Sequence, residues 1–391
     1  MRVIGARSAL FLPFVDLGLI IVDEEHDGSY KQEEVVCYHA RDMAVMRGHM
    51  AGAQVVLASA TPSLETWLNA RTGKYGRIDL NERFGNALLP KVEILNLKEQ
   101  DITKNTFISS YLRDEIENRL WQGQQSLLFL NRRGYAPVTL CQACGFQIGC
   151  KFCDSRLVQH RLRNILMCHQ CGRSEIIPST CPNCHTEGQL KAVGPGVEKI
   201  AQECQILFPD ARVGILSSDN IENVMNLQET FSKLASGEID IVIGTQLVSK
   251  GHNFSNITLV GVIDADLGLQ GSDLRASEKT FQSLRQVSGR AGRYEKLGKA
   301  IIQTYSPDHP VIMAIAEGND DAFWELEAQA RRRAQSPPYG KMIALILSGP
   351  SERELFDLGQ KLVRIWKCSY QIDAQIFGPA LAPVGKIRKR F

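Results

Sequence analysis

Apolar residues follow two alternating patterns along this chain. Short unbroken apolar runs between polar residues are typical of buried strands, and apolar positions three and four residues apart are typical of helices. The runs predict strands at 17–22, 54–60, 126–130, 239–245, 257–264 and 299–304. The helical spacing predicts helices at 39–52, 109–123, 197–208 and 277–290. Because strands and helices alternate, we expect parallel α/β sheets that are covered on both faces.

Side-chain directions and helix starts also follow from the pattern. In the helix at 39–52, the spacing directs Met43, Val45 and Met46 towards the core. After the strand at 54–60, Thr61-Pro62 is expected to open another helix, because proline is favoured at the first helical position.

The pattern changes after residue 305. A helical stretch rich in Ala, Glu and Arg leads to Pro337-Pro338-Tyr339-Gly340, a predicted strand at 342–347 and a predicted helix at 352–366. A cysteine-rich segment also interrupts the preceding pattern. We therefore expect an α/β unit at 1–98, a second at 99–305 with an insertion at 141–184, and a partial α+β domain at 306–391.

Composition restricts the protein class only loosely. The chain is 44% hydrophobic and 23% charged with a formal charge of +2, which is ordinary for a globular protein and compatible with a local basic patch for nucleic acid. No apolar run approaches the roughly 20 residues that span a bilayer. The first residues also lack the pattern of a signal peptide. A cytoplasmic location without a membrane partner is expected.

An acidic cluster follows the first predicted strand, in the sequence Asp23-Glu24-Glu25-His26. The carboxyl edge of a parallel sheet is where ligands bind in such folds. Asp23 is suited to hold magnesium, which prefers carboxylate and phosphate oxygens, and Glu24 is suited to orient or deprotonate an attacking water. A solvated acidic turn is the alternative, since so short a motif also occurs by chance.

Further polar groups follow later strands. Ser59 and Thr61 end the second predicted strand, and Thr245-Gln246, with Lys250-Gly251 downstream, end the strand at 239–245. Gln286, Arg290 and Arg293 fall at i, i+4 and i+7 of one helical face. Two guanidiniums directed at one point suit the charge on a γ-phosphoryl group. Each group alone also fits a turn, a cap or a surface arginine, but their order favours a nucleotide site.

These motifs resemble those of known helicases. D-E-E-H, S-A-T, G-T-Q with K-G, and Q-x-x-G-R-x-G-R are similar to the later motifs of superfamily 2 helicases. Longer stretches resemble the replication-restart helicases of the PriA family (primosomal protein N′) over essentially the whole chain. They are 8-SALFLPF-14, 23-DEEHDGSYKQEE-34, 58-ASATPSLET-66, 128-LFLNRRGY-135, 194-GPGVEKI-200, 243-IGTQLVSKGHNF-254 and 378-GPALAP-383.

The resemblance implies two RecA-like lobes and an ATP-dependent DNA helicase. Such an enzyme moves 3′ to 5′, opens branched forks and starts primosome assembly. The implied ligands of ATP with Mg²⁺ are Asp23, Glu24, Gln286, Arg290 and Arg293. The implied residues that couple nucleotide to DNA are His26, Tyr30, Lys31, Ser59, Thr61, Thr245, Gln246, Lys250 and Gly251. Branched or single-stranded DNA, primosome proteins and single-stranded-DNA-binding protein are the implied partners of a monomer.

The resemblance also predicts a fragment with an incomplete first lobe. The family carries an N-terminal DNA-binding region and a G-x-x-x-x-G-K-[ST] loop that cradles phosphates, a pattern not found in these 391 residues. The stretch at 386–391 resembles family sequence that precedes its last strands. We therefore expect little ATPase activity from this chain alone. The alternative is a non-catalytic, zinc-containing protein that binds DNA and primosome partners.

Eight of the eleven cysteines form four C-x-x-C pairs, at Cys141/Cys144, Cys150/Cys153, Cys168/Cys171 and Cys181/Cys184. Four pairs suffice for two structural Cys₄ zinc sites, with disulfides or an iron–sulfur cluster as alternatives. Spacing leaves sequential and nested pairing open. The resemblance favours nesting, with one zinc on the outer two pairs and the other on the inner two. The remaining Cys37, Cys204 and Cys368 are expected to be buried.

Basic and aromatic residues leave two readings open. Between the cysteine pairs lie five basic residues, Lys151, Arg156, Arg161, Arg163 and Arg173, which suit either a DNA backbone or a solvated face. Tyr30, in the polar loop after the acidic cluster, suits either stacking on an unpaired base or packing within its own loop.

Overall fold

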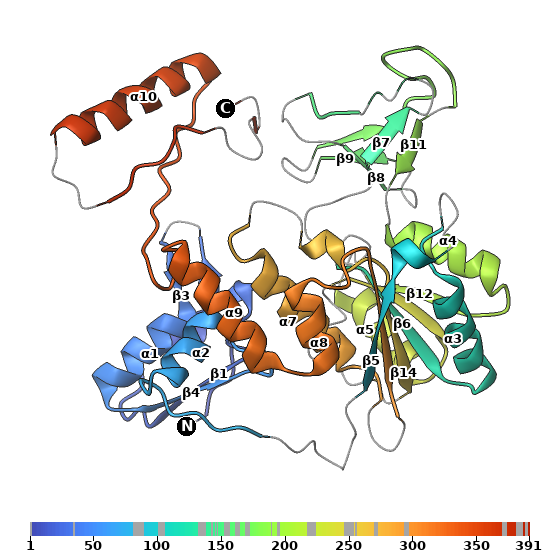
Figure 1. Cartoon of the computed structure of the whole chain (residues 1–391), viewed down its shortest axis with the longest axis horizontal. Helices are drawn as coiled ribbons and strands as arrows, with labels where there is room; N and C mark the ends of the chain where they lie inside the picture. Colours follow the sequence, from blue (N-terminus) through green and yellow to red (C-terminus); the bar gives the residue numbers. More distant parts are fainter. Residues whose placement is uncertain are drawn as a thin grey trace.

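The computed structural model shows two α/β units, a cysteine-rich insertion and a C-terminal helical part (Figure 1). The residues that the structure describes are 2–33, 36–80, 90–100, 106–131, 138–141, 144, 146, 148–151, 157–160, 165–168, 173–188, 190–193, 196–216, 224–245, 254, 256–269, 273–292, 297–369, 374–380, 386–387 and 390–391.

The second unit is built on a six-stranded sheet in the order β12-β13-β6-β14-β15-β5, and every neighbouring pair is parallel. Its strands are β5 (Lys91–Asn96), β6 (Gln125–Phe129), β12 (Val213–Leu216), β13 (Ile241–Gly244), β14 (Ile257–Val262) and β15 (Lys299–Thr304). All residues of β6, β13 and β14 are buried, as expected for strands that are covered on both faces.

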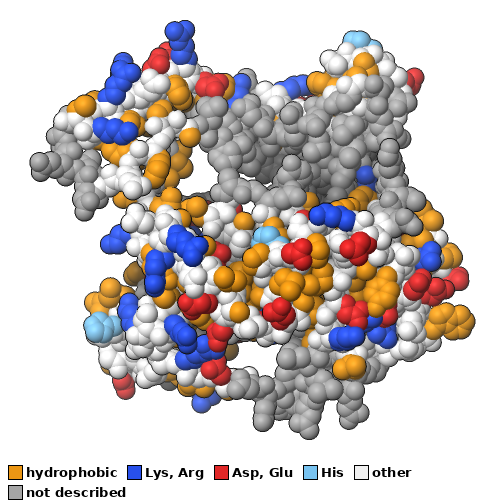
Figure 2. Space-filling view, in the orientation of Figure 1, with side chains coloured by type: hydrophobic (Ala, Val, Ile, Leu, Met, Phe, Trp, Pro, Cys, Tyr) orange, Lys and Arg blue, Asp and Glu red, His pale blue; other side chains and the backbone are white. Residues whose placement is uncertain are grey.

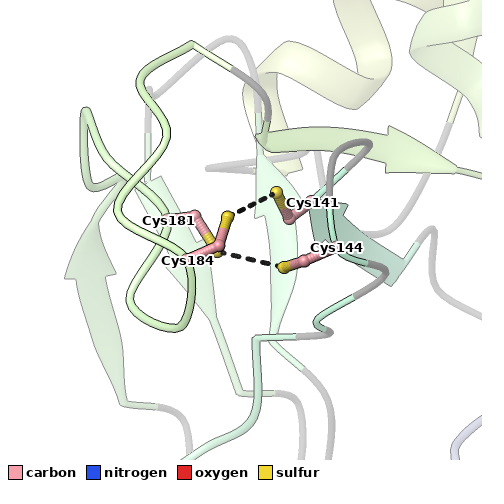
Figure 3. Close-up of side chains that lie close together, drawn as sticks. All are labelled: Cys141, Cys144, Cys181 and Cys184. Carbon is pink, nitrogen blue, oxygen red and sulfur yellow. Dashed lines mark hydrogen bonds between the residues drawn. The ribbon is translucent and has the colours of Figure 1, made fainter.

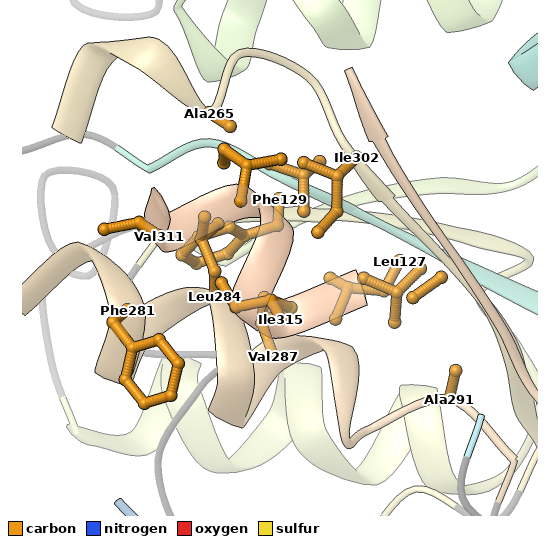
Figure 4. Close-up of a cluster of buried hydrophobic side chains, with 14 of the residues drawn as sticks. Leu127, Phe129, Ala265, Phe281, Leu284, Val287, Ala291, Ile302, Val311 and Ile315 are labelled. Atoms are coloured by element: carbon orange, nitrogen blue, oxygen red, sulfur yellow. The ribbon is translucent and has the colours of Figure 1, made fainter. Parts of the chain in front are cut away.

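Helices cover the two faces of this sheet. They are α3 (Ser110–Trp121), α4 (Val197–Leu207), α5 (Val224–Ala235), α7 (Ala276–Ser288), α8 (Pro310–Glu317) and α9 (Asp320–Arg333). Leu128 and Leu130 share one core with residues of α3 and α4. Leu127 and Phe129 share the other core with residues of α5, α7, α8 and α9, part of which Figure 4 shows. Alternate residues of one strand therefore serve opposite cores.

The first unit contains a parallel pair of strands, β1 (Leu19–Asp23) and β4 (Gln54–Ala58), with α1 (Ala40–Ala51) packed against both. The direction predicted for the methionines of α1 is wrong, since Met43 and Met46 are exposed. The helix instead buries Ala40, Arg41, Ala44 and Gly48. A side chain at Gly48 would lie 2.2 Å from Val55, so close packing on β4 requires this small face.

The next helix, α2 (Leu64–Arg71), begins later than predicted. Ser63 is its N-cap, and the Ser63 hydroxyl accepts a hydrogen bond from the Thr66 N–H. Pro62 therefore lies before the cap and not at the first helical position. The reason is that serine at the cap satisfies an N–H group that would otherwise have no partner at the helix start.

The strand β5 lies inside the range expected for the first unit, 1–98, but it pairs with β15 of the second unit over six residues. We therefore place the start of the second unit before Lys91. The predicted α/β class, with a parallel sheet and a cysteine-rich insertion, is confirmed.

The insertion forms its own antiparallel sheet in the order β10-β9-β8-β7-β11. The strands are β7 (Val138–Cys141), β8 (Val158–His160), β9 (Ile165–Met167), β10 (Ser174–Ile176) and β11 (Leu190–Val193). A small core of Ile148, Leu157, Leu166 and Cys168 supports it. This core is separate from the two cores of the parallel sheet.

The C-terminal part contains α10 (Glu352–Ser369), which confirms the helix predicted at 352–366. The strand predicted at 342–347 is wrong, since this described segment is exposed and has no strand partner among the described residues. Apolar side chains consequently remain on the surface around α10, as Figure 2 shows in orange. A β-rich sequence forms a strand only where a neighbouring strand accepts its hydrogen bonds.

Candidate functional site

The acidic turn begins where β1 ends. Asp23 lies opposite Ala58 in the parallel pair, and the Glu25 N–H donates to the Ala58 carbonyl (3.1 Å). Glu24 has a positive φ of 47°, a conformation that is uncommon outside glycine. This turn leaves the Asp23 and Glu24 side chains exposed at the carboxyl edge of the pair.

The end of β4 meets the acidic turn through His26. The His26 Nδ1 lies 2.7 Å from the Ser59 hydroxyl, which also accepts the Thr61 N–H at 3.0 Å. The Thr61 hydroxyl is buried and has no hydrogen-bond partner among the described residues. The D-E-E-H and S-A-T motifs thus form one connected polar edge.

Residues of α7 reach this edge from the second unit. The Gln286 Nε2 lies 3.2 Å from Glu24 Oε2, to which it donates, and 3.0 Å from His26 Nε2. These partners are 262 and 260 residues apart in the sequence. The structure therefore brings together the first and last motifs of the predicted nucleotide site.

The other predicted residues of the second unit are placed only in part. Thr245 is buried directly after β13, at the carboxyl edge of the sheet, and its N–H donates to the Leu216 carbonyl. Arg290 is buried just beyond α7, which ends at Ser288 with Gly289 as its cap. The predicted helical face for Arg290 is wrong because the helix ends first. Gln246, Lys250, Gly251 and Arg293 lie outside the described residues.

Tyr30 is held by its own loop. Its hydroxyl donates to the Asp23 carbonyl at 2.7 Å, and burial followed by the charge of Asp23 raises its pKa above the usual value. This contact favours packing over free stacking on a base. Lys31 pairs with His39 in a short antiparallel ladder of β2 (Lys31–Gln32) and β3 (Tyr38–His39).

Glu25 has a structural part in the turn that the sequence did not indicate. It is fully buried, and it accepts hydrogen bonds from the Ser63 N–H (2.6 Å) and from the Ser63 and Thr66 hydroxyls. Arg41 of α1 balances its charge at 3.1 Å. Glu25 therefore ties the acidic turn to the start of α2.

The outer cysteines of the insertion form a compact cluster. The four Sγ atoms of Cys141, Cys144, Cys181 and Cys184 lie within 4.8 Å of one another (Figure 3). The Cys141–Cys184 and Cys144–Cys181 sulfur distances are 3.6 and 3.7 Å. Tetrahedral zinc with bonds of about 2.3 Å requires sulfur atoms about 3.8 Å apart. The residues therefore fit a zinc ion with all four positions filled by protein.

Local backbone and hydrogen bonds prepare this cluster. The Cys141 N–H donates to the Phe146 carbonyl and the Cys181 N–H to the Thr186 carbonyl, so a backbone hydrogen bond holds the first cysteine of each outer pair. The side chain and backbone of Thr186 lower the pKa of Cys184 to about 6. A thiol with that pKa is largely a thiolate at neutral pH, which is the form that binds metal.

The inner cysteines are described only in part. Cys150 and Cys168 lie in the insertion, Cys168 within its core, whereas Cys153 and Cys171 lie outside the described residues. Of the isolated cysteines, Cys204 is buried, and burial raises its pKa to about 12. The expected burial of Cys37 and Cys368 is wrong, since both are exposed.

Comparisons with known proteins match these regions. The model of the PriA DNA helicase Cys-rich region domain matches residues 150–175, and that of the helicase conserved C-terminal domain matches 196–295. A replication restart protein PriA of Rickettsia conorii is 44% identical over 389 residues, which is 100% of this chain and 60% of that protein. The chain belongs to the PriA family. The Bacillus subtilis PriA is 38% identical, over 100% of this chain and 48% of that protein.

The chain thus spans about half to 60% of the length of these PriA relatives. The crystal structure of the DUF1998 helicase MrfA bound to DNA gives a TM-score of 0.41 at 17% identity, over 78% of this chain and 33% of that chain, a similarity too low to support further comparison. Among the described helices of this PriA-family chain, none has the length and apolar character that crossing a membrane requires.

Proposed function

We propose that this chain carries the magnesium side and the second lobe of an ATP-driven DNA helicase that acts in replication restart. The contact of Gln286 with Glu24 and His26 carries the proposal, because it joins two motifs from different units at one point. Membership of the PriA family supports the biological process. Movement 3′ to 5′, fork recognition and primosome assembly follow from the family resemblance.

In this proposal, Asp23 and Glu24 of the acidic turn have different roles, magnesium binding and general-base catalysis. Asp23, exposed at the end of β1, holds the magnesium of ATP, which neutralises phosphate charge when bound. Glu24 orients the attacking water and takes its proton. Gln286 fixes the Glu24 side chain from the opposite unit. The contact between the two units is therefore proposed to position the general base.

Arg290 and Arg293 are proposed to stabilise charge on the γ-phosphoryl group, as guanidiniums do in related motors. Coupling to DNA is proposed for the residues that line the same edge or follow the strands of the second unit. They are His26, Tyr30, Lys31, Ser59, Thr61, Thr245, Gln246, Lys250 and Gly251.

Two zinc ions are proposed as structural cofactors. The outer site consists of Cys141, Cys144, Cys181 and Cys184, and its sulfur distances support zinc. The inner site consists of Cys150, Cys153, Cys168 and Cys171, and rests on spacing and on the matched Cys-rich region. Partners of the monomeric chain are proposed to be branched or single-stranded DNA, primosome proteins and single-stranded-DNA-binding protein.

The domain division stays part of the proposal, with the first lobe ending before Lys91, the second lobe ending at 305 and the partial C-terminal domain at 306–391. The sequence contains no G-x-x-x-x-G-K-[ST] pattern. We therefore propose that the chain alone hydrolyses ATP weakly or not at all. The second candidate, which the missing pattern favours, is a non-catalytic DNA- and partner-binding protein.

ATP hydrolysis with forked DNA tests the two candidates. The chain is compared with a version extended by the upstream helicase motifs of a PriA relative. We expect ATP hydrolysis only in the extended version, and Glu24→Gln should lower its rate at least about a hundredfold. Glu229→Gln, an exposed helix change, is the matched control. If the short chain hydrolyses ATP and Glu24→Gln abolishes that activity, the non-catalytic candidate is refuted.

A further inference from the structure

Three polar side chains form a stripe along α7. Glu278, Gln282 and Gln286 are spaced four residues apart and therefore lie on one face of the helix. All three contact the first unit, over sequence separations of 214 to 262 residues. We call this stripe the α7 contact face. Only Gln286 belongs to the motifs discussed above.

Gln282 holds the loop that precedes α2. Its Nε2 donates to the Thr61 carbonyl at 3.3 Å and to the Pro62 carbonyl at 3.2 Å. The side chain is buried, so water cannot replace these bonds without opening the contact between the units. The loop therefore presents two adjacent carbonyl oxygens to α7.

Glu278 holds the first turn of α2. Its Oε1 accepts the Leu64 N–H at 3.2 Å, and its Oε2 accepts hydrogen bonds from Arg331 (2.6 Å) and Arg275 (3.2 Å). Only 2% of Glu278 is exposed, so the two guanidiniums are needed to balance the buried charge. Arg275 also pairs with Glu65 on α2, which adds a second link between the units.

Two carboxylates, one from each unit, bind the start of α2. Glu25 of the first unit accepts the Ser63 N–H, and Glu278 of the second unit accepts the adjacent Leu64 N–H. The first N–H groups of a helix have no partner within the helix, and its N-terminus favours negative charge. Two buried carboxylates from different units therefore fix the loop 61–64 in position between them.

We propose that Glu278 and Gln282 are positioning residues, which dock the loop 61–64 on α7 so that Gln286 reaches Glu24 and His26. Their importance for ATP hydrolysis rests on the proposed function. The docking itself does not, because its contacts lie entirely within this chain and involve neither nucleotide nor DNA.

The test removes the amide of Gln282 while keeping the volume of the side chain. Gln282→Met is compared with Gln125→Met. Gln125 is an equally buried glutamine whose Nε2 donates to two backbone carbonyls, of Leu234 and Ile239, inside the second unit. The chain is studied without nucleotide by two readouts, the nitrogen resonances of the His26 ring and the hydrogen exchange of the Ser63 and Leu64 amides.

We expect Gln282→Met to shift the His26 ring resonances and to speed exchange at Ser63 and Leu64 by about tenfold, as loss of two hydrogen bonds implies. Gln125→Met is expected to leave both readouts unchanged. A folded Gln282→Met protein with the parent His26 resonances would overturn the proposal. So would an equal shift in Gln125→Met, because general loss of stability would then explain both.

If Gln282→Met does not fold, Glu278→Gln provides the same test, since it keeps an acceptor for the Leu64 N–H but removes the charge that holds Arg275 and Arg331. Its control is Glu203→Gln, a carboxylate that accepts the Phe107 and Ile108 N–H groups within the second unit. The His26 ring resonances and the exchange of the Ser63 and Leu64 amides are again the readouts, with the same outcomes for and against the proposal. A failure of the ATPase test would leave these outcomes unaffected.

Discussion

The outer cysteines and the α7 contact face join distant parts of the chain in contrasting ways. The cysteine contacts link residues 37 and 43 positions apart, and all four ligands are of one type, in pairs with fixed spacing. The contacts of the α7 face span more than 200 positions and combine a carboxylate with two amides. From the sequence, all four cysteines of the first set were predicted as metal ligands with their pairing left open, whereas only Gln286 of the second set was singled out.

The difference is one of chemistry as well as distance. Paired C-x-x-C motifs supply four thiolates at the spacing that tetrahedral metal sites use, so the pattern alone predicts a metal site. Glutamate and glutamine on a helix are most often solvated, and nothing local distinguishes a buried one. In the proposed zinc site, stabilisation would come mainly from one metal ion, whereas the α7 contact face divides it among several hydrogen bonds.

The largest expected effect follows from removing a zinc ligand. Cys181→Ser should abolish metal at the outer site, because binding of structural zinc is worth about 10–16 kcal/mol and requires all four thiolates. The insertion should then lose protection from hydrogen exchange, while the parallel sheet, which has separate cores, keeps its own. Metal content per chain and exchange at β7 and β11 are the measurements. Cys204→Ser, a buried cysteine outside the cluster, should retain zinc, and a Cys181→Ser protein with unchanged zinc would contradict the assignment.

A smaller effect is expected at the α7 contact face. Glu278→Ala removes the buried carboxylate that Arg275 and Arg331 share, although Arg275 keeps Glu65 and Arg331 keeps Glu327, so the free energy of unfolding should fall by about 1–3 kcal/mol. Urea unfolding followed by circular dichroism measures it. Glu229→Ala removes an exposed i,i+4 pair with Lys233 and should leave the urea midpoint unchanged. Equal midpoints for the two variants would show that Glu278 does not hold the units together.

The smallest effect concerns the pH dependence of the contact between units. Burial alone would raise the pKa of Glu65, but the hydrogen bond and charge of Arg275 outweigh it and lower the pKa below the usual 4.5. A lowered folded pKa stabilises the protein above pH 4.5, and this stabilisation is lost as the pH falls through the folded value. The Glu65→Gln protein should therefore be less stable than the parent at pH 7. Between pH 7 and pH 3 it should lose less stability than the parent does. If the stability curves of parent and variant ran parallel between pH 7 and 3, the Arg275–Glu65 ion pair would not contribute the expected stabilisation.

The local elements were largely predictable. The strands β1, β4, β6, β13, β14 and β15 and the helices α1, α3, α4, α7 and α10 lie where the apolar pattern predicts them, within a few residues. Two exceptions have tertiary causes, since the apolar segment 342–347 has no neighbouring strand among the described residues and β5 joins the sheet of the second unit. A third exception is local, because α7 ends at Ser288 and does not reach Arg290.

The sequence by itself determined the α/β class, the four cysteine pairs and the motifs that place this chain in the PriA family, because each depends on residues that are close in the chain. Only the tertiary structure decided which cysteines of the outer pairs meet, that Glu25 is a buried support, and that Glu278 and Gln282 face the first unit. Such roles arise when folding brings distant residues together and removes water from between them. A buried carboxylate and an exposed one have the same letter in the sequence, and only their surroundings separate a structural role from a solvated one.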